Sequence, residues 1–402
     1  MDADDRETHH DCERSKQMNH EISQTDILCY FTNFPTPRMQ KIIRAVSGQG
    51  KVSLIYWKRS DIDFQSGLSD CAREIPVAAS FLHNRGLCRI IAFLIFVCKS
   101  WLLIRRAKKA RILYVNYLDV LLVAALAVRR RGVKFIYGIG DLAPAQYGGR
   151  PWVNATVRRL EQCLLKRVSV LILSSPFFWS EYYAKIYTGR WQLIENMPRA
   201  HVWKNFQPKT TRVPCVVGFV GWIRDYKPIE CLLGAIGGLR RDGYDIRVFF
   251  AGFGPDEARL KQHCLHLDYV DFSGPYQYDR DAQALYSRVD IIFSVFDIGV
   301  ANSKILMPNR FYDAIAAGLP LMVASGTKLA ERVAALGIGY CVDYLSEDDM
   351  KAALISHIRC DGEAANIAEA LRKVDKQAYF YDPYEKVLSD LFAVDKQGNI
   401  NA

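Results

Sequence analysis

A basic loop in the second half of the chain has residue types that bind a diphosphate. In GFVGWIRDYKPIE (218–230), an apolar run ends at Gly221, Arg224 and Lys227 follow, and Pro228 suits the first position of a helix. A guanidinium binds oxyanions bidentately, an ammonium adds a point charge, and a helix N-terminus attracts anions. The loop therefore predicts a diphosphate clamp, with two solvated loop cations as the alternative.

Two glycines follow another apolar run in the same half of the chain. The segment AGFGPDE places Gly252 and Gly254 directly after that run. Because glycine has no side chain, the backbone at these positions could approach a ligand closely. Two glycines after a strand do not specify a ligand by themselves, so they are candidate binding residues only in combination with the basic loop.

An acid and a base lie near the start of a third segment, ANSKILMPNRFYDAIAAGLPLMVAS. Here Pro308 is expected to begin a helix, and Asn309, Arg310 and Asp313 fall in its first two turns. From there Arg310 could reach a phosphate above a sheet, and Asp313 could accept hydrogen bonds from two sugar hydroxyls. The alternative is that the two charged residues stabilise the helix as a pair.

In the first half of the chain, VKFIYGIGDLAPAQYGG (133–149) has a comparable pattern. A strand-like run delivers Gly138, Gly140 and Asp141 to one edge of the predicted sheet. Small residues there let a sugar approach the backbone, and Asp141 could accept the proton of a hydroxyl as a general base. Its alternative role is to cap the following turn. The loop TNFPTPRMQK, which follows the first strand-like run, brings Arg38 near the same substrate.

Short apolar runs alternate with helix-like segments along nearly the whole chain. The runs lack period-2 alternation, which is typical of strands buried on both faces of a parallel sheet. The alternation restarts after a polar linker, so we expect an α/β protein with two parallel-sheet domains. The predicted organisation is a disordered tail at 1–24, a domain at 25–204, a linker at 205–213, a second domain at 214–375, and a C-terminal helix at 376–402 with the N-terminal domain as its candidate packing partner.

The composition is that of a globular protein with anionic partners. The chain has 402 residues, of which 50% are hydrophobic and 24% charged, which excludes a disordered or fibrous protein. A net charge of +10 favours phosphates, nucleic acid or acidic lipid without choosing among them. The eleven cysteines form no CxxC pair and the tail has no apolar run. We therefore expect a reducing, cytoplasmic location and no secretory signal.

One segment, 87–111, combines a strongly apolar run with clustered positive charge. The run at 90–98 is nine residues long, and six basic residues lie between Lys99 and Arg111. The run is too short for a transmembrane helix, which needs about 20 apolar residues. Two interpretations remain: a helix packed on the sheet with a basic exposed end, or an interfacial helix attracted to an anionic inner-membrane surface. Nucleic acid is disfavoured because no stacking aromatic residues are interleaved with the charges.

The order of GFVGWIRDYK, VFFAGFG, VDFSGPYQYDRDAQALYSRVDIIFSVF and PNRFYDAIAAGLPLMVAS resembles the donor-binding half of GT-B glycosyltransferases, in particular those similar to glycosyltransferase family 4. The resemblance covers 213–345 and extends more loosely through 112–198. It implies two Rossmann-like domains that face a cleft. The implied donor-binding residues are Gly221, Arg224, Lys227, Gly252, Gly254, Asn309, Arg310 and Asp313, and the implied acceptor-binding residues are Arg38, Gly138 and Gly140.

The sequence departs from the family pattern at one acidic position. The family's Glu-x7-Glu motif falls on Ile305 and Asp313, so the first Glu is missing. The segment PNRFYD instead resembles the PNKxxEY variant, which would place Arg310 where a phosphate-binding Lys stands. Some inverting members of the fold carry an Asp in a strand-end setting similar to that of Asp141. The resemblance therefore leaves both retention and inversion of the sugar configuration open.

The resemblance implies a hexosyltransferase-type reaction. A nucleotide diphosphate sugar would serve as co-substrate. A hydroxyl of a saccharide acceptor, expected to be lipid-linked, would receive the sugar during bacterial surface polysaccharide synthesis. Arg224 would act in catalysis by neutralising the departing diphosphate without a metal or another cofactor. The acidic triplet at 279–281 opens a predicted helix, where acids suit the helix dipole, so we interpret it as structural and not as a metal site.

Two alternatives belong to different functional classes. A sugar-nucleotide epimerase could use the same two-domain architecture and would release nucleotide diphosphate without forming an acceptor-linked sugar. A peripheral membrane scaffold without turnover could keep the fold, and the missing Glu is compatible with it. A nicotinamide oxidoreductase is disfavoured because TNFPTP, and not GxGxxG, follows the first strand.

Overall fold

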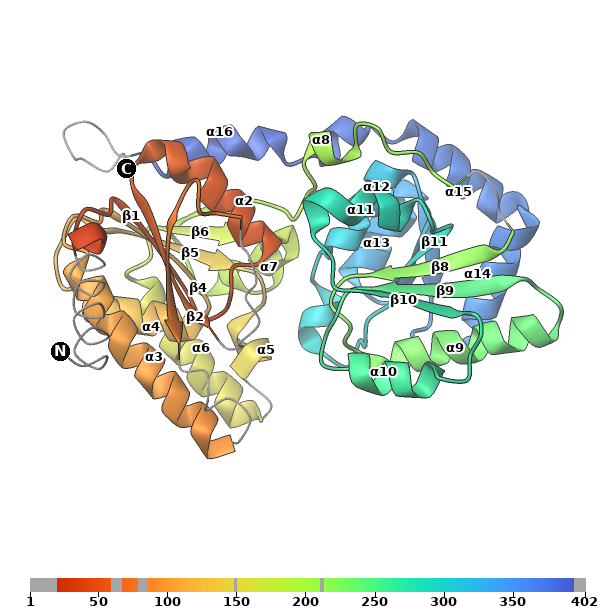
Figure 1. The fold of residues 1–402 in the computed structure, drawn as a ribbon, viewed down its shortest axis with the longest axis horizontal. Helices are drawn as coiled ribbons and strands as arrows, with labels where there is room; N and C mark the ends of the chain where they lie inside the picture. Colours follow the sequence, from red (N-terminus) through yellow and green to blue (C-terminus); the bar gives the residue numbers. More distant parts are fainter. Residues whose placement is uncertain (1–19, 59–66, 79–85, 148–149, 210–212, 394–402) are drawn as a thin grey trace, which may run out of the picture. The chain divides into compact units, whose positions relative to one another are not determined.

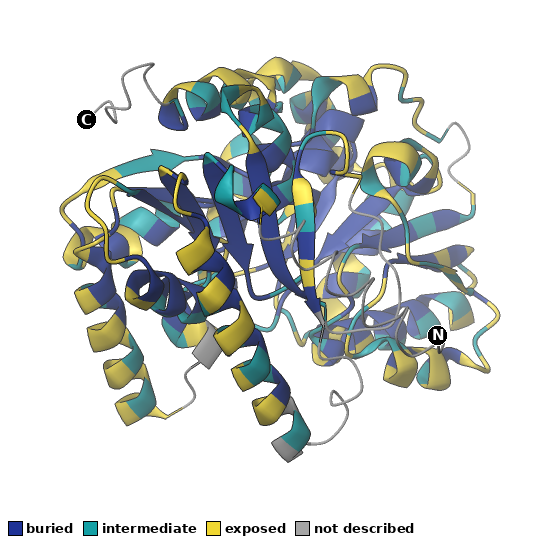
Figure 2. Cartoon of the chain, turned by 60° about the vertical axis from the view of Figure 1, so that its left-hand side comes forward, coloured by how far each residue is buried: buried dark blue, intermediate teal, exposed yellow. Residues whose placement is uncertain are grey.

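The computed structural model describes residues 20–58, 67–78, 86–147, 150–209 and 213–393 (Figure 1). The chain forms two compact units. Unit 1 comprises Met1–Ile194 and Pro383–Ala402, and unit 2 comprises Glu195–Asp382. Figure 2 shows that the strands of the sheets are largely buried, whereas the helices carry many of the exposed positions.

Unit 1 is built on a seven-stranded sheet in the order β3-β2-β1-β4-β5-β6-β7, and all of its strand pairs are parallel. Its strands are β1 (Ile27–Phe31), β2 (Val52–Lys58), β3 (Arg73–Ala78), β4 (Ile112–Asn116), β5 (Lys134–Ile139), β6 (Val170–Leu173) and β7 (Arg190–Leu193). Its helices are α2 (Pro37–Val46), α3 (Gly86–Arg106), α4 (Leu118–Ala127), α5 (Ala143–Tyr147), α6 (Pro151–Leu165), α7 (Pro176–Glu181) and α16 (Asp382–Leu391). Figure 1 shows α3, α4 and α6 on one face of the sheet and α2 and α16 on the other.

Unit 2 is built on a six-stranded sheet in the order β10-β9-β8-β11-β12-β13, again with parallel pairs. Its strands are β8 (Cys215–Val220), β9 (Ile246–Ala251), β10 (Val270–Gly274), β11 (Ile291–Ser294), β12 (Leu321–Ala324) and β13 (Gly339–Val342). Its helices are α8 (Ala200–Trp203), α9 (Tyr226–Arg241), α10 (Glu257–Cys264), α11 (Tyr278–Tyr286), α12 (Asn309–Ala317), α13 (Lys328–Leu336), α14 (Glu347–Arg359) and α15 (Gly362–Lys373). The prediction of two parallel α/β sheets is confirmed.

The boundary between the units lies before the linker that the sequence indicates at 205–213. Helix α8 explains the difference, because the ring of Trp203 lies 5.4 Å from the ring of Tyr286 in unit 2. This packing adds the segment before the linker to unit 2. Residues 210–212 of the predicted linker lie outside the described residues.

Residues 20–24 form part of unit 1, although the sequence indicates a disordered tail through residue 24. Ile22 is fully buried, and Glu21 Oε2 lies 2.9 Å from Arg73 Nε. A single apolar residue among polar neighbours gave no sign of this burial in the sequence. The rest of the predicted tail, residues 1–19, lies outside the described residues.

The C-terminal helix α16 returns to unit 1. The ring of Phe392, just after the helix, is fully buried and meets the ring of Tyr114 edge-on at 5.7 Å. The helix starts later than the sequence segment 376–402 indicates, because Lys376–Tyr379 forms a separate 3-10 turn that belongs to unit 2. Unit 1 is therefore assembled from two separate stretches of the chain.

Helix α3 has a buried face and an exposed apolar face. Phe96 is fully buried and stacks on Trp57 at 5.5 Å, whereas Ile90, Ile91 and Leu94 are 58%, 50% and 55% exposed. The helix thus packs on the sheet, as the first sequence interpretation expects, and it also leaves apolar side chains uncovered. The attraction to a membrane surface stays a prediction. Within the described residues, no helix is both long and apolar enough to cross a membrane.

The carboxyl ends of β8, β9 and β11 place three loops of unit 2 at one edge of its sheet. Helix α12 follows the third loop, with Pro308 as its N-cap. The helix ends at Gly318, which adopts a left-handed conformation with φ 70° and is therefore suited to glycine. Both limits agree with those that the sequence predicts. In open parallel sheets, ligands bind at this edge.

Candidate active site

Two guanidinium groups lie near Phe296 at the carboxyl edge of the unit 2 sheet. The Arg310 guanidinium carbon is 5.0 Å from the centre of the Phe296 ring and 4.2 Å from that of Phe219. The corresponding carbon of Arg224 lies 6.0 Å from the Phe296 ring. The structure thus brings together two cations that the sequence places 86 residues apart. Guanidinium groups bind oxyanions such as phosphates bidentately, so the pair agrees with the residue types expected of a diphosphate clamp.

Arg310 is the buried member of this pair. Only 7% of it is exposed, and its Nη1 donates a hydrogen bond of 2.6 Å to the carbonyl oxygen of Phe293 at the end of β11. Burial, together with a smaller effect of the neighbouring charge of Arg224, lowers the pKa of Arg310 to about 10. The side chain therefore still carries its positive charge at neutral pH, in a place where water screens it poorly.

Arg224 is the accessible member, and Lys227 lies further out. The side chain of Arg224 is 42% exposed, and its Nε forms a long ion pair of 3.8 Å with Asp225 Oδ2, so solvent and a ligand can reach the guanidinium. Lys227 is exposed in the first turn of α9, which begins at Tyr226 and thus two residues before the predicted start at Pro228. Asn309 is likewise exposed, at the first position of α12.

Asp225 is a charged residue of this site that our sequence reasoning did not single out. It is the N-cap of α9 with a left-handed backbone, φ 62°. Its buried Oδ2 accepts no hydrogen bond from the described residues but lies 3.8 Å from Nε of Arg224. The pKa of Asp225 is raised, mainly by burial and also by the negative charge of Asp297. The positive charges of Arg224 and Arg310 offset part of this increase. The only signal in the sequence was an acid placed directly after Arg224.

The two predicted glycines serve loop packing. A Cβ at Gly252 would lie 1.9 Å from the carbonyl oxygen of Gly221, and one at Gly254 would lie 2.1 Å from that of Ile223. The amide of Ile223 also donates to the carbonyl of Phe253 at 2.9 Å. These contacts account for both glycines without a ligand. They hold the β8–α9 loop against the loop that follows β9.

Asp313 points into unit 2 and is already hydrogen-bonded. It is 2% exposed, one carboxylate oxygen accepts a hydrogen bond from the Tyr278 hydroxyl, and the other accepts one of 2.8 Å from Tyr286. Contact with sugar hydroxyls, as the sequence predicts, would require these bonds to open. In this structure Asp313 instead connects α12 to α11.

An exposed aromatic pair borders the glycine loops and was also missed from the sequence. Trp222 is 52% exposed, and its ring meets that of Phe253 edge-on at 5.0 Å. Large aromatic surfaces at the mouth of a site can stack on a flat ring such as a nucleobase. A bulky aromatic residue directly after Gly221 was the signal that could have identified it.

The residues predicted to bind the acceptor lie at the carboxyl edge of the unit 1 sheet. A Cβ at Gly138 would lie 2.1 Å from Oδ1 of Asn116, so packing within the sheet explains this glycine. Among the described residues, no atom would lie within 4 Å of a Cβ at Gly140. Asp141 is partly exposed, and Arg38 is 7% exposed.

The Asp-Arg-Asp triplet at 279–281 lies in the first turn of α11. Asp281 accepts a hydrogen bond of 2.8 Å from the amide of Gln277 and forms an ion pair of 2.7 Å with Arg280. These contacts agree with the structural role that the sequence predicts. Within the described part of the chain, no group of three or more metal-binding side chains is found.

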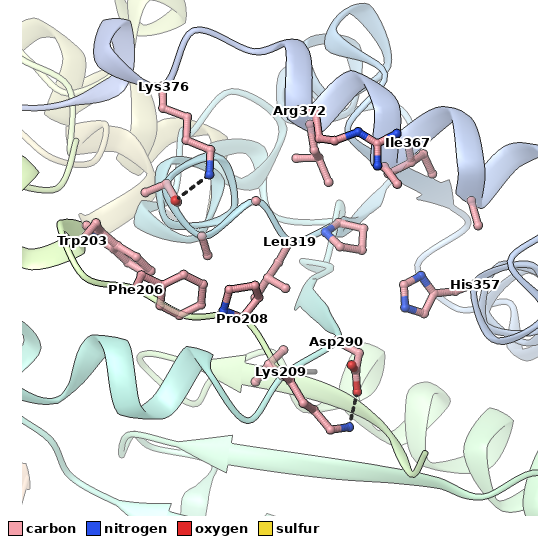
Figure 3. A pocket seen from close by; sticks show the side chains of 18 of the residues that line it. Trp203, Phe206, Pro208, Lys209, Asp290, Leu319, His357, Ile367, Arg372 and Lys376 are labelled. Atoms are coloured by element: carbon pink, nitrogen blue, oxygen red, sulfur yellow. Dashed lines mark hydrogen bonds and ion pairs between the residues drawn. The ribbon is translucent and has the colours of Figure 1, made fainter. Parts of the chain in front are cut away.

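A groove of about 1230 Å³ lies at the opposite, amino-terminal edge of the unit 2 sheet (Figure 3). Its walls include Trp203, Leu319 and Arg372, together with a 2.7 Å ion pair between Lys209 and Asp290. Asp290 directly precedes β11. The groove is therefore at the other end of the strand from Arg310 and is not part of the candidate active site.

Comparisons with known proteins agree with this geometry. Residues 214–359 match the family model described as Glycosyl transferases group 1. Sucrose-phosphate synthase from Thermosynechococcus elongatus has a similar structure, with a TM-score of 0.70 and 16% identity over 91% of this chain and 98% of that one. The chain adopts the GT-B fold. No curated protein sequence matches it significantly.

Other GT-B structures show that the fold alone does not determine the reaction. HepE from Anabaena, in complex with UDP-glucose, has a TM-score of 0.66 and 15% identity over 90% of this chain and 98% of that one. A candidate UDP-N-acetylglucosamine 2-epimerase from Listeria monocytogenes has a TM-score of 0.60 and 10% identity over 94% of this chain and 100% of that one. The family match at 214–359 supports a GT-B glycosyltransferase.

The packing role of Gly252 can be tested with alanine. Gly252→Ala adds a methyl group against a carbonyl oxygen at a residue with φ 127°, so we expect a loss of at least about 2 kcal/mol in the free energy of unfolding of unit 2. Gly243→Ala is the control, because φ is 89° but no described atom lies within 4 Å. Urea unfolding should show a clearly larger loss for Gly252→Ala, and equal losses would contradict the packing role.

The partly buried side chain of Asp225 leads to a prediction about pH. Its raised pKa means that the folded state holds the proton more tightly than the unfolded state, in which the pKa is about 4. The charge of Asp225 thus costs stability progressively as pH rises above about 4. We expect Asp225→Asn to raise the unfolding temperature, relative to wild type, more at pH 7 than at pH 4. A difference that is constant over this range, or larger at pH 4, would contradict the prediction.

Proposed function

We propose that the protein is a hexosyltransferase that moves a sugar from a nucleotide diphosphate sugar to a hydroxyl of a saccharide acceptor. The observation that carries this proposal is the placement of Arg310 and Arg224 beside Phe296 at the carboxyl edge of the unit 2 sheet. This edge lies inside the segment 214–359 that matches the group 1 glycosyltransferases. HepE, which has a similar structure, was solved with UDP-glucose bound.

The two arginines have complementary roles in this reaction. As the bond to the sugar breaks, negative charge builds up on the leaving diphosphate. Arg310 is fixed by its bond to Phe293 and presents a charge that needs no rearrangement, while Arg224 is exposed and can close on the phosphates. Preorganised charge of this kind is a large contribution to catalysis. We propose that these two cations neutralise the diphosphate without a metal or another cofactor.

The proposed acceptor contacts lie in unit 1. Asp141 follows β5 and is partly exposed, so water or a sugar hydroxyl can reach its carboxylate. Next to it, Gly140 leaves open space where a side chain would otherwise project. We propose that Asp141 accepts the proton of the attacking hydroxyl as a general base, which requires hydrogen-bond contact with that hydroxyl.

The exposed face of α3 supports a lipid-linked acceptor. Its uncovered apolar residues are followed by exposed basic residues, among them Arg105, Arg106, Lys108 and Lys109. Apolar side chains beside positive charge bind the surface of anionic membranes. A peripheral position on the inner face of a bacterial membrane would give access to lipid-linked saccharides, which are intermediates of surface polysaccharides.

Donor binding is the first test of the proposal. We expect one class among UDP, GDP, dTDP and CMP sugars to stabilise the wild type, by about 2.7 kcal/mol at a hundred times its dissociation constant. The increase in unfolding temperature should be lost in Arg224→Ala and kept in Arg241→Ala, a control at the exposed far end of α9. Two outcomes would count against a diphosphate clamp at Arg224. In one, a sugar nucleotide stabilises Arg224→Ala and Arg241→Ala equally; in the other, no sugar nucleotide stabilises the wild type or either variant.

The reaction product separates transfer from epimerisation. With a radiolabelled donor and a lipid extract, a transferase places label on the acceptor, whereas an epimerase releases nucleotide diphosphate without labelling it. Epimerisation is the second candidate function because the structure is also similar to that of a candidate epimerase. Asp141→Asn should abolish labelling of the acceptor while leaving the donor-induced increase in unfolding temperature unchanged.

The membrane contact can be tested by flotation with vesicles. We expect the wild type to float with vesicles that contain phosphatidylglycerol, less so in high salt, because salt screens the charges. Ile91→Glu and Leu94→Glu place a charge on the exposed face of α3 and should abolish flotation. Leu265→Glu is the control, since Leu265 is 75% exposed in unit 2. Flotation that survives in both α3 variants, or is absent in the wild type, would contradict this role for α3.

A further inference from the structure

A second buried cation lies in unit 1, far along the sequence from the diphosphate clamp. Arg38 is the second residue of α2, after Pro37, and is 7% exposed. Its Nη2 donates long hydrogen bonds of 3.4 Å to the carbonyl of Ile172 in β6 and 3.5 Å to that of Ile194 after β7. The guanidinium therefore sits at the edge of the sheet where ligands bind in α/β proteins.

Most of the hydrogen-bonding capacity of Arg38 is unused. Its Nε and Nη1 are buried and find no hydrogen-bond partner among the described residues, which leaves three N–H groups unsatisfied there. In the part of the chain that the structure describes, no carboxylate pairs with it. A guanidinium keeps its proton in proteins, so this is a buried, uncompensated positive charge. Such an arrangement is costly, and an anionic ligand that fills the site would remove the cost.

Two acidic residues, Asp119 and Asp141, act on Tyr117 as Arg38 does, but neither forms an ion pair with Arg38 among the described residues. Both carboxylate oxygens of Asp119 accept hydrogen bonds of 2.8 Å from the Thr32 hydroxyl. The pKa of Tyr117 is raised mainly by burial and also by the negative charge of Asp141. The positive charge of Arg38 lowers the same pKa. Tyr117 thus lies within the electrostatic reach of both Arg38 and the candidate base.

Two further features of the segment support an anion. Lys41, one turn after Arg38 on the same face of α2, is also buried, with 8% exposed. Tyr117 has a left-handed backbone with φ 77°, which a tyrosine adopts only when the surroundings enforce it. The start of α2 thus carries two buried basic residues, of which Arg38 reaches the carboxyl edge of the sheet.

We propose that Arg38 binds an oxyanion, a phosphate or a carboxylate, carried by the acceptor saccharide. This proposal rests on the proposed function and specifies the acceptor as a sugar phosphate or an acidic sugar. An anion held by Arg38 would anchor the acceptor while one of its hydroxyls approaches Asp141. Arg38 then selects charged acceptors over neutral ones, because only a charged acceptor compensates the buried guanidinium.

The test measures anion binding to the full-length protein without nucleotide. The probes are inorganic phosphate, glucose 6-phosphate, glucuronate and glucose, at constant ionic strength, in thermal-shift and calorimetric titrations. We expect at least one anionic probe, but not glucose, to raise the unfolding temperature of the wild type. Arg38→Gln should weaken that binding at least about tenfold, as expected for the loss of a hydrogen bond to a charged group. Comparing phosphate, sugar phosphate and glucuronate separates free phosphate from the two types of acidic sugar.

Two variants provide matched controls. Arg44→Gln removes an arginine from the same helix, but one that is partly exposed and paired with Asp70 at 3.4 Å, so anion binding should be unchanged. Arg224→Ala removes the accessible cation of the diphosphate clamp and should also keep the binding. Loss of the effect in Arg224→Ala would show that the anion binds at the clamp and would overturn the proposal.

Stability without ligand provides a readout that a purely structural role would not reproduce. Because Arg38 is buried without a counter-ion, Arg38→Gln should unfold at the same or a higher temperature than the wild type. If Arg38→Gln fails to fold, Arg38 has a structural role and the proposal fails, unless Arg38→Lys folds and retains weaker anion binding, which would support it. Unchanged binding in Arg38→Gln, equal binding of glucose, or binding of no anionic probe would each overturn it. Failure of the donor test at Arg224 alone would instead count against the proposed function.

Discussion

The close approach of two backbone segments in unit 2 is the constraint on which the candidate site depends. Gly252 and Gly254 pack so closely against the carbonyl groups of Gly221 and Ile223 that neither position has room for a Cβ atom. The loop after β8 is thereby fixed by its neighbour and needs no ligand to order it. Because Arg224 and Asp225 follow directly, main-chain packing determines where the backbone of both residues lies, while the exposed side chain of Arg224 can still move.

Both units leave a positive charge at the ligand-binding edge of the sheet without a paired carboxylate in the described residues. Arg310 is covered by two phenylalanine rings and bonded to a carbonyl, and Arg38 is held by two long bonds to carbonyls. Carbonyl oxygens and ring faces orient a guanidinium without cancelling its charge. The charge stays available for an anion, which is a requirement shared by the proposed donor and acceptor sites.

The sequence predicted the sheets well because their strands are buried on both faces and read as continuous apolar runs. It predicted the limits of α12 because proline and glycine mark helix ends directly. It did not predict that Trp203 packs on Tyr286 and moves the unit boundary, because that contact joins residues far apart in the chain. For the same reason it assigned Asp313 to a ligand, since the two tyrosines that occupy its oxygens lie on another helix. Residue types thus indicated candidate charges, whereas the orientation of each side chain depended on tertiary contacts.

The return of α16 to unit 1 has a consequence for the order of folding during synthesis. Unit 2 is continuous in sequence and is complete once residue 382 has left the ribosome. Unit 1 begins earlier, yet it lacks the helix that brings Phe392 against Tyr114 until the last part of the chain has been made. Since chains emerge at roughly 5–20 residues per second, the first unit to begin synthesis is the last to complete its core. A chaperone that recognises exposed apolar surface would therefore meet unit 1 open at the place that α16 later covers.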